Sequence, residues 1–229
     1  MSNGEQKNWA LVLGASSGFG GAASLELARA GYSIFGLHLD RKSTMPNVER
    51  LVGEIESVGQ TAVFFNVNAA DAEKRDEVLA EMVKRTDGGT SGTVKILLHS
   101  LAFGTLKRFI GETPADEISA AQMAMTMDVM ANSLVYWTQG VMRHGLMTSG
   151  GRIYALTSAG SHRVWPFYGP VSAAKAALES LIRQLSVELI THGITANALQ
   201  AGVTDTPALR KIPGNDVMIS RVIETHPGG

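Results

Sequence analysis

The sequence predicts an α/β fold in which helices cover both faces of one parallel sheet. Short aliphatic or β-branched runs alternate with longer helical patterns, as in repeated βαβ units. Two of the short runs, at residues 62–65 and 95–98, are almost continuously apolar, which is typical of parallel strands buried on both sides. A glycine-rich turn directly after the first run supports a doubly wound sheet.

We expect six strands, in the order 3-2-1-4-5-6 of a doubly wound sheet. In chain order they cover residues 9–13, 33–38, 61–67, 94–99, 152–156 and 195–199. The helical patterns between and after them cover residues 20–30, 45–58, 71–85, 117–143, 170–191 and 216–224. No repeat or linker divides the chain, so residues 1–229 are expected to form one domain.

Composition excludes several classes of protein. The net charge of −1 offers no electrostatic footprint for nucleic acid or an anionic membrane. The absence of cysteine excludes disulfides and thiolate metal sites, and no metal is expected. No apolar stretch approaches the roughly 18 residues of a membrane span, and the polar start is unlike a signal peptide. We therefore expect a cytoplasmic protein.

The glycine-rich turn reads Gly14-Ala15-Ser16-Ser17-Gly18-Phe19-Gly20 and lies between the first expected strand and the first helix. In that place Gly14 makes the tight turn, Gly18 lets the backbone approach a pyrophosphate, and Gly20 allows close helix packing. The free N–H groups at the helix start favour phosphate. The motif predicts dinucleotide binding by a Rossmann-type domain, with Ser16, Ser17 and Phe19 also at the cofactor.

The end of the second strand bears on which nicotinamide cofactor binds. Asp40 would hydrogen-bond a ribose 2′-hydroxyl, whereas Arg41 and Lys42 would attract a 2′-phosphate. Counted from Gly31, the strand tip is His38, and Asp40 falls past it. A merely solvated turn is the alternative. Of the two cofactors the sequence favours NADP(H) over NAD(H).

Tyr168 and Lys175 stand seven residues apart, and Ser158 precedes them at the end of the fifth strand. Pro170 suits the first position of a helix, so Tyr168 is expected just before the helix and Lys175 in its second turn. From residue 8 onwards these motifs resemble the short-chain dehydrogenase/reductase superfamily. Most members space the catalytic tyrosine and lysine by four, where this chain has Val171. A spacing of seven resembles the enoyl-acyl-carrier-protein reductases.

That resemblance implies reduction of the double bond of a 2-enoyl thioester, bound to acyl carrier protein or coenzyme A, in fatty acid biosynthesis. Tyr168 would stabilise the enolate, Lys175 would hold the nicotinamide ribose, and Ser158 would contact substrate or cap a turn. Ser158 replaces a second tyrosine of some members, which resembles the NADPH-dependent type called enoyl reductase III. The remaining residues expected near the cofactor are Asn66, Val67, Ser100, Leu101, Ala102, Val203, Thr204 and Thr206. His99 is assigned no chemical role.

The chain departs from its relatives in two places. Ketone-reducing members use an asparagine in the long fourth helix, where this chain has Met130; Asn132 would face about 200° away on an α-helix. These families also add a further helix and a seventh strand, so we expect a chain truncated at its C-terminus. A homodimer or homotetramer is expected through the apolar face of the helix at residues 117–143, which includes Met123, Met127, Leu134 and Trp137. Burial of that face within the subunit is the alternative.

Two other functions compete with enoyl reduction. A carbonyl reductase or alcohol dehydrogenase would use Tyr168 as its acid, although Met130 and the spacing of seven weigh against it. A protein that binds NADP(H) and regulates a partner without turnover would have no need of both Tyr168 and Lys175.

Overall fold

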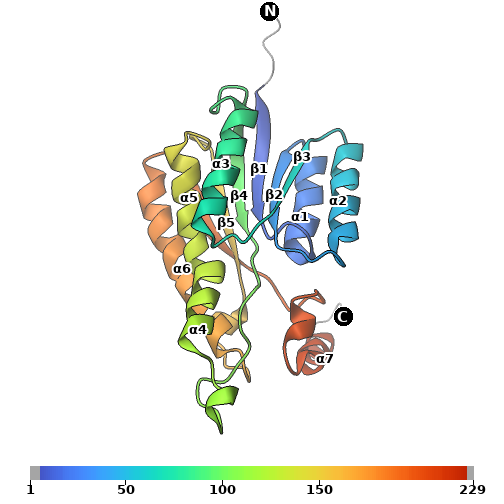
Figure 1. The fold of residues 1–229 in the computed structure, drawn as a ribbon, viewed down its shortest axis with the longest axis vertical. Coiled ribbons are helices and arrows are strands. Elements are labelled where there is room, and N and C mark those ends of the chain that lie inside the picture. The colour runs from blue at the N-terminus through green and yellow to red at the C-terminus, as the bar shows by residue number, and fades with distance from the viewer. Residues whose placement is uncertain (1–5, 226–229) are drawn as a thin grey trace, which may run out of the picture.

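One sheet of six parallel strands runs through the centre of the molecule in the computed structural model, which describes residues 6–225 (Figure 1). The order across the sheet is β3-β2-β1-β4-β5-β6, as predicted. The strands are β1 (Lys7–Leu13), β2 (Ser33–His38), β3 (Ala62–Asn66), β4 (Gly92–His99), β5 (Arg152–Thr157) and β6 (Thr195–Gln200). The first five residues and the last four, on which the predictions about the polar start and the chain end partly fall, lie outside the described residues.

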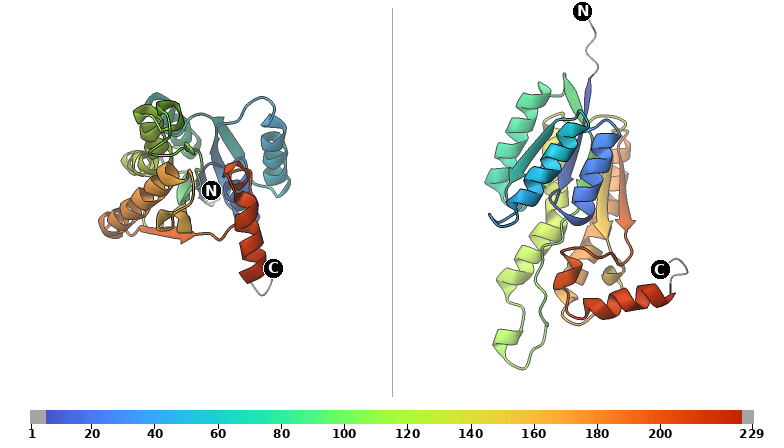
Figure 2. Two further views of the ribbon diagram at one scale, coloured as in Figure 1. Left: turned by 90° about the horizontal axis from the view of Figure 1, so that it is seen from below. Right: turned by 90° about the vertical axis from the view of Figure 1, so that its right-hand side faces the viewer.

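Helices cover both faces of the sheet, which confirms the predicted fold class (Figures 1 and 2). The helices α1 (Gly18–Arg29) and α2 (Met45–Ser57) pack on one face, over β1, β2 and β3. The other face carries α3 (Ala72–Thr86), α5 (Ser133–Arg143) and α6 (Gly169–Ile190), which contact β4, β5 and β6. No helix among the described residues is long and apolar enough to cross a membrane.

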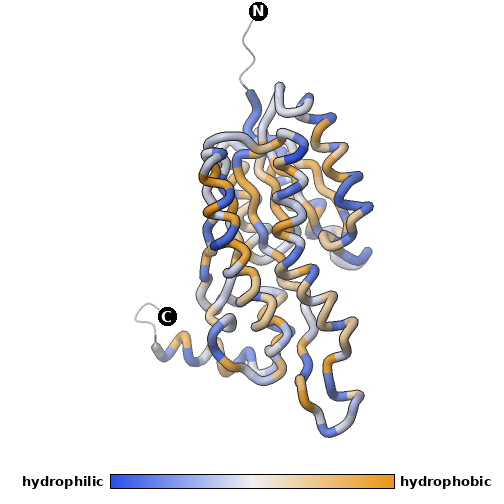
Figure 3. Tube along the Cα trace, turned by 90° about the vertical axis from the view of Figure 1, so that its left-hand side faces the viewer, coloured by the Kyte–Doolittle hydropathy of each residue, from blue (hydrophilic) through white to orange (hydrophobic). Residues whose placement is uncertain are grey.

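The largest hydrophobic cluster lies between the sheet and α3, α5 and α6, and Figure 3 shows hydrophobic residues concentrated along the central strands. Trp9 of β1 stacks on Phe35 of β2 with ring centroids 3.9 Å apart. Trp137 of α5 is fully buried and donates a hydrogen bond from Nε1 to the carbonyl of Ala69, 2.9 Å away. A tryptophan buries well only when its N–H finds such an acceptor.

The long fourth helix differs from the prediction. It begins as α4 (Ala120–Met127), where Ser119 and Gln122 form a capping box, and continues through a π-helical turn at Asp128–Asn132 into α5. The wider i→i+5 spacing makes the α-helical angle assumed between Met130 and Asn132 wrong. Met130 is buried, and the Asn132 amide donates to Asp128 Oδ1 at 2.7 Å. Polar i,i+4 pairs also occur in ordinary helices, so the sequence held no clear signal of this turn.

The expected partner face on this helix is wrong for two of its four residues. Leu134 and Trp137 are fully buried within the subunit, against the central cluster. Met123 and Met127 are only half-buried. The alternative of an intramolecular face therefore holds for α5, while the oligomeric state stays a prediction.

The last helix, α7 (Asn215–Thr225), confirms the helical pattern near the end of the described chain. It contacts the short turn at Leu209–Lys211 but buries none of its own side chains. In Figure 2 it extends outward below the carboxyl end of the sheet. The segment between β6 and α7 contributes Thr206, Pro207, Ala208 and Lys211 to the lining of a cleft.

Candidate functional site

The glycine turn joins β1 to α1 at the carboxyl end of the sheet. The N–H groups of Gly14 and Ala15 donate to the carbonyl of Leu37, at 2.9 and 2.8 Å, and so tie the turn to the end of β2. Gly14 has φ of +88°, and a Cβ there would lie 2.5 Å from the carbonyl oxygen of Ser100. A Cβ on Gly20 would lie 2.0 Å from the carbonyl oxygen of Gly14. Only glycine therefore allows this close approach of turn, helix and β4.

A cleft of about 210 Å³ opens above this turn, between the carboxyl ends of β1 and β4. This is the point where strand order reverses, at which doubly wound folds bind ligands. The first turn of α1 has no acidic residue and no side-chain cap on its N–H groups, which leaves them available to an anion. The cleft therefore fits the pyrophosphate of a dinucleotide.

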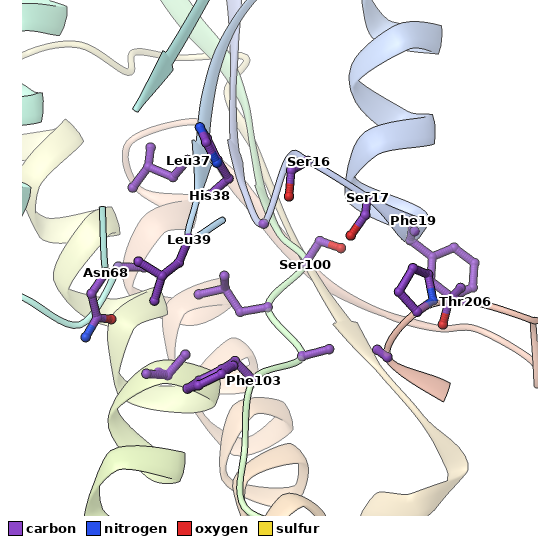
Figure 4. Close-up of a pocket in the computed structure, with 18 of the residues that line it drawn as sticks. Ser16, Ser17, Phe19, Leu37, His38, Leu39, Asn68, Ser100, Phe103 and Thr206 are labelled. Carbon is purple, nitrogen blue, oxygen red and sulfur yellow. The ribbon is translucent and has the colours of Figure 1, made fainter. Parts of the chain in front are cut away.

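Ten residues predicted at the cofactor line the cleft (Figure 4): Gly14, Ser16, Ser17, Gly18, Phe19, Val67, Ser100, Leu101, Ala102 and Thr206. Seven others do not line it: Gly20, Asp40, Arg41, Asn66, Lys175, Val203 and Thr204. Their predicted contact with cofactor stays a prediction. Gly20 does not face the cleft but packs against the glycine turn that forms it.

Asn66 has a visible role of another kind. Its side-chain amide donates to the Asp40 carbonyl and its Oδ1 accepts from the Asp40 N–H, both at 3.0 Å. This reciprocal pair anchors the loop after β2 to the end of β3. Asp40 turns its carboxylate to Nδ1 of His38, 3.1 Å away.

Ten further lining residues were not among those predicted at the cofactor: Leu37, His38, Leu39, Asn68, Ala69, Phe103, Val129, Pro207, Ala208 and Lys211. Seven of them lie within two residues of a predicted residue, so a slightly longer motif would have included them. Leu37, Val129 and Lys211 lie further from any predicted residue. Figure 4 shows Leu39, Asn68 and Phe103 on the opposite side of the cleft from Ser16, Ser17 and Phe19.

Tyr168 and Ser158 come together beside α6. Tyr168 is the N-cap residue of α6, just outside the helix as predicted, and its hydroxyl lies 3.5 Å from Ser158 Oγ. Ser158 follows β5 and also accepts a hydrogen bond from the N–H of Gly160 at 3.2 Å. A Cβ on Gly160 would lie 2.4 Å from the Tyr168 ring, so this loop packs closely against the tyrosine. Two hydroxyl groups can thus meet one substrate oxygen.

Lys175 lies in the second turn of α6, as predicted, and is 6% exposed. Its ammonium donates to the carbonyl of Leu156 at 2.6 Å and to that of Leu101 at 3.3 Å. Burial lowers the pKa of Lys175 to about 8, although the charge of Glu179 opposes the shift. Because Leu101 lines the cleft, the hydrogen bond to its carbonyl connects α6 to the wall of the cleft.

His99, at the end of β4, is fully buried. Its Nε2 lies 2.9 Å from Ser133 Oγ, which itself donates to the carbonyl of Val129 at 2.8 Å. Burial, with a smaller effect of the Lys175 charge, lowers the pKa of His99 to about 3. The imidazole is therefore neutral, holds the π-helical turn to β4, and acts here as a packing residue.

Comparison with known proteins identifies a family that matches this chain. A family model described as enoyl-(acyl carrier protein) reductase matches residues 14–229. The 1-cyclohexenylcarbonyl-CoA reductase of Streptomyces collinus is 26% identical over 205 residues, which cover 90% of this chain and 68% of that protein. The NADH-dependent enoyl-[acyl-carrier-protein] reductase FabI of Aquifex aeolicus (strain VF5) is 31% identical over 139 residues, or 60% of this chain. This chain matches 50% of that enzyme's length.

The crystal structure of the Aquifex aeolicus enzyme has the same fold, with a TM-score of 0.78. The match covers 98% of this chain and 83% of that one, at 24% sequence identity.

Proposed function

The chain belongs to the enoyl-(acyl carrier protein) reductase family, and we propose that it reduces the carbon–carbon double bond of a 2-enoyl thioester. The observation that carries the proposal is the position of Tyr168, on the N-cap of α6 and seven residues before Lys175. A tyrosine on the same helix, one turn before the lysine, would approach the substrate from a different direction.

The electron balance assigns a role to each side chain. A reduced nicotinamide, when bound, supplies the hydride for the β-carbon of the substrate. The pair of electrons of the double bond then moves toward the thioester oxygen, which becomes an enolate oxygen. The Tyr168 hydroxyl donates a hydrogen bond to that oxygen, where negative charge develops. A proton taken up at the α-carbon completes the reduction.

Lys175 supports this step through its hydrogen bonds and its positive charge. A buried ammonium that is already bonded to two carbonyls holds the ends of β4 and β5 in place. Its positive charge also favours the developing oxyanion and the ribose hydroxyls of the cofactor. Ser158, beside the tyrosine, orients the Tyr168 hydroxyl or shares the substrate oxygen.

The proposed substrate is an acyl thioester, of acyl carrier protein or of coenzyme A. Relatives named for each carrier match the chain. Phe103 lines the cleft and Phe109 lies against Gly169 at the start of α6. Both are half-exposed, and apolar side chains of this kind suit an acyl chain. A single domain, a homo-oligomer and a place in fatty acid biosynthesis stay predictions.

Carbonyl reduction is the second candidate, and the Ser158–Tyr168 pair is the observation that favours it. Two hydroxyls 3.5 Å apart could hold a ketone oxygen as well as a thioester oxygen. Against it, Met130 is buried among Val129, Val171 and Ala174, so this position offers no polar group for a proton relay. Enoyl reduction is therefore preferred.

Replacement of the hydroxyl tests the proposal. We predict that Tyr168→Phe lowers turnover of a 2-enoyl thioester by about 10²–10³, because one donor to the developing charge is lost. Cofactor affinity should change by less than about threefold, since the ring remains. Turnover and fluorescence titration of the reduced cofactor measure the two quantities.

Tyr136→Phe is the matched control, because Tyr136 lies exposed on α5. It should leave both quantities unchanged. Undiminished turnover in Tyr168→Phe would remove the proposed role of the tyrosine.

A further inference from the structure

His38, the last residue of β2, lies where the cleft begins. Its side chain is only 2% exposed, yet it lines the cleft beside Leu37 and Leu39 (Figure 4). The preceding residue, Leu37, accepts the two hydrogen bonds from the glycine turn. The glycine turn and the imidazole of His38 are therefore adjacent. In folds of this type the end of β2 lies beside the ribose that is attached to the pyrophosphate.

The contact with Asp40 fixes which nitrogen of His38 carries the proton. An ionised carboxylate can only accept, so the His38 Nδ1 that lies 3.1 Å from Asp40 Oδ2 must be the donor. Burial opposes ionisation of Asp40, but hydrogen bonds from Ser16, Thr44 and His38 outweigh it and hold the pKa of the carboxyl below its usual value. Burial also lowers the pKa of His38, more than Asp40 raises it, so the ring is neutral at pH 7. Its Nε2 is then a lone-pair acceptor.

Among residues 6–225, Nε2 of His38 has no hydrogen-bond partner. It is also not among the unpartnered polar atoms that are fully shielded from solvent. Because His38 lines the cleft, this nitrogen is free to accept a hydrogen bond from a bound ligand. The Asp40 carboxylate, by contrast, already accepts the hydrogen bond from His38 Nδ1. Arg41 is exposed and does not line the cleft.

We propose that His38, and not Asp40 or Arg41, selects the cofactor, by accepting a hydrogen bond from the ribose 2′-hydroxyl at Nε2. Asp40 is a positioning residue that holds the required tautomer. The inference rests on the proposed use of a nicotinamide dinucleotide, and it favours NADH over NADPH. It therefore reverses the preference predicted from the sequence.

The selectivity follows from charge and hydrogen bonding. A 2′-hydroxyl can donate to Nε2, whereas the 2′-phosphate of NADPH brings only acceptors and negative charge to a lone pair. Behind the imidazole lies the Asp40 carboxylate, which repels the same phosphate. A site built to pair with a hydroxyl rejects a group that leaves its buried polar atom unpaired.

Direct binding of the two reduced cofactors tests the inference without any substrate. Fluorescence titration at pH 7.5 should give NADH a dissociation constant at least about tenfold lower than that of NADPH. His38→Ala should weaken NADH by about tenfold and change NADPH by less than about threefold. His38→Gln, whose amide oxygen can replace the acceptor, should keep the preference for NADH. His38→Arg should favour NADPH, because guanidinium binds phosphate well.

Arg41→Ala is the discriminating variant. An unchanged NADH/NADPH ratio supports the inference, whereas a selective loss of NADPH binding overturns it in favour of Arg41. Tighter NADPH binding by the unaltered protein also overturns it, and this measurement holds even if the His38 variants do not fold. NADH-selective binding without reduction of enoyl thioesters would refute the proposed reaction and leave the role of His38 standing.

Discussion

At the scale of single residues, Lys175 combines a charge with nearly complete burial. Two backbone carbonyls and Glu179 compensate the ammonium only in part, so burial still lowers its pKa to about 8. A lysine of this kind changes its charge within the working range of an enzyme. The charge should matter most for an anionic cofactor.

We predict that affinity for the reduced cofactor falls as the pH rises through about 8. Below that value Lys175 carries its proton and attracts the cofactor, and above it the charge is lost. Between pH 7 and pH 9.5 the dissociation constant should rise several-fold in fluorescence titrations. Lys175→Arg, which stays charged throughout, should remove this rise. An equally steep rise in Lys175→Arg would assign the effect to another group.

At the scale of elements, the β1–turn–α1 unit depends on glycines that no other residue can replace. We predict that Gly20→Ala abolishes cofactor binding and lowers the free energy of unfolding, because its Cβ would lie 2.0 Å from the carbonyl oxygen of Gly14. Gly53→Ala is the matched control on α2, since a Cβ there meets nothing within 4 Å. It should stabilise the protein by about 0.5–1 kcal/mol.

Urea unfolding and cofactor titration of both variants check this prediction. Normal cofactor affinity in Gly20→Ala would show that the turn can open, contrary to the packing described above.

The same scale shows how far the sequence predicts the structure. The strand order, the glycine turn and the position of Tyr168 before α6 follow from local patterns, and the structure confirms them. The π-helical turn does not follow, since the contact between Ser133 and His99 that accompanies it joins residues 34 positions apart. The position of Asp40 does not follow either, since Asn66, 26 positions away, binds its backbone.

At the scale of the whole molecule, one hydrophobic cluster joins the cleft to Tyr168, the proposed catalytic residue. Val129 lines the cleft and packs with Met130, Val171 and Ala174, against which Tyr168 rests. The cluster ties the fourth helix to α6. His99 fixes the other side of the π-helical turn, at the end of β4. Loss of this arrangement should therefore affect stability and the site together.

We predict that the protein loses stability as the pH falls below about 6.5. His99 is buried and neutral, with a folded-state pKa of about 3, so the unfolded chain binds a proton that the folded state excludes. The free energy of unfolding should fall by up to about 1.4 kcal/mol per pH unit for this one group. Urea unfolding at pH 7.5 and pH 5 measures it.

His99→Asn should reduce that dependence on pH, and the exposed His192→Asn should not. Equal slopes in His99→Asn and the unaltered protein would show that other groups cause the acid sensitivity.

Oxidation of reduced nicotinamide by the purified protein would show whether this chain reduces a carbon–carbon double bond. NADH and NADPH are each offered with a trans-2-enoyl thioester and, separately, with a 3-ketoacyl thioester. We expect faster oxidation with the enoyl substrate. Oxidation with the keto substrate alone would contradict it and would make the Ser158–Tyr168 pair a carbonyl-reducing site.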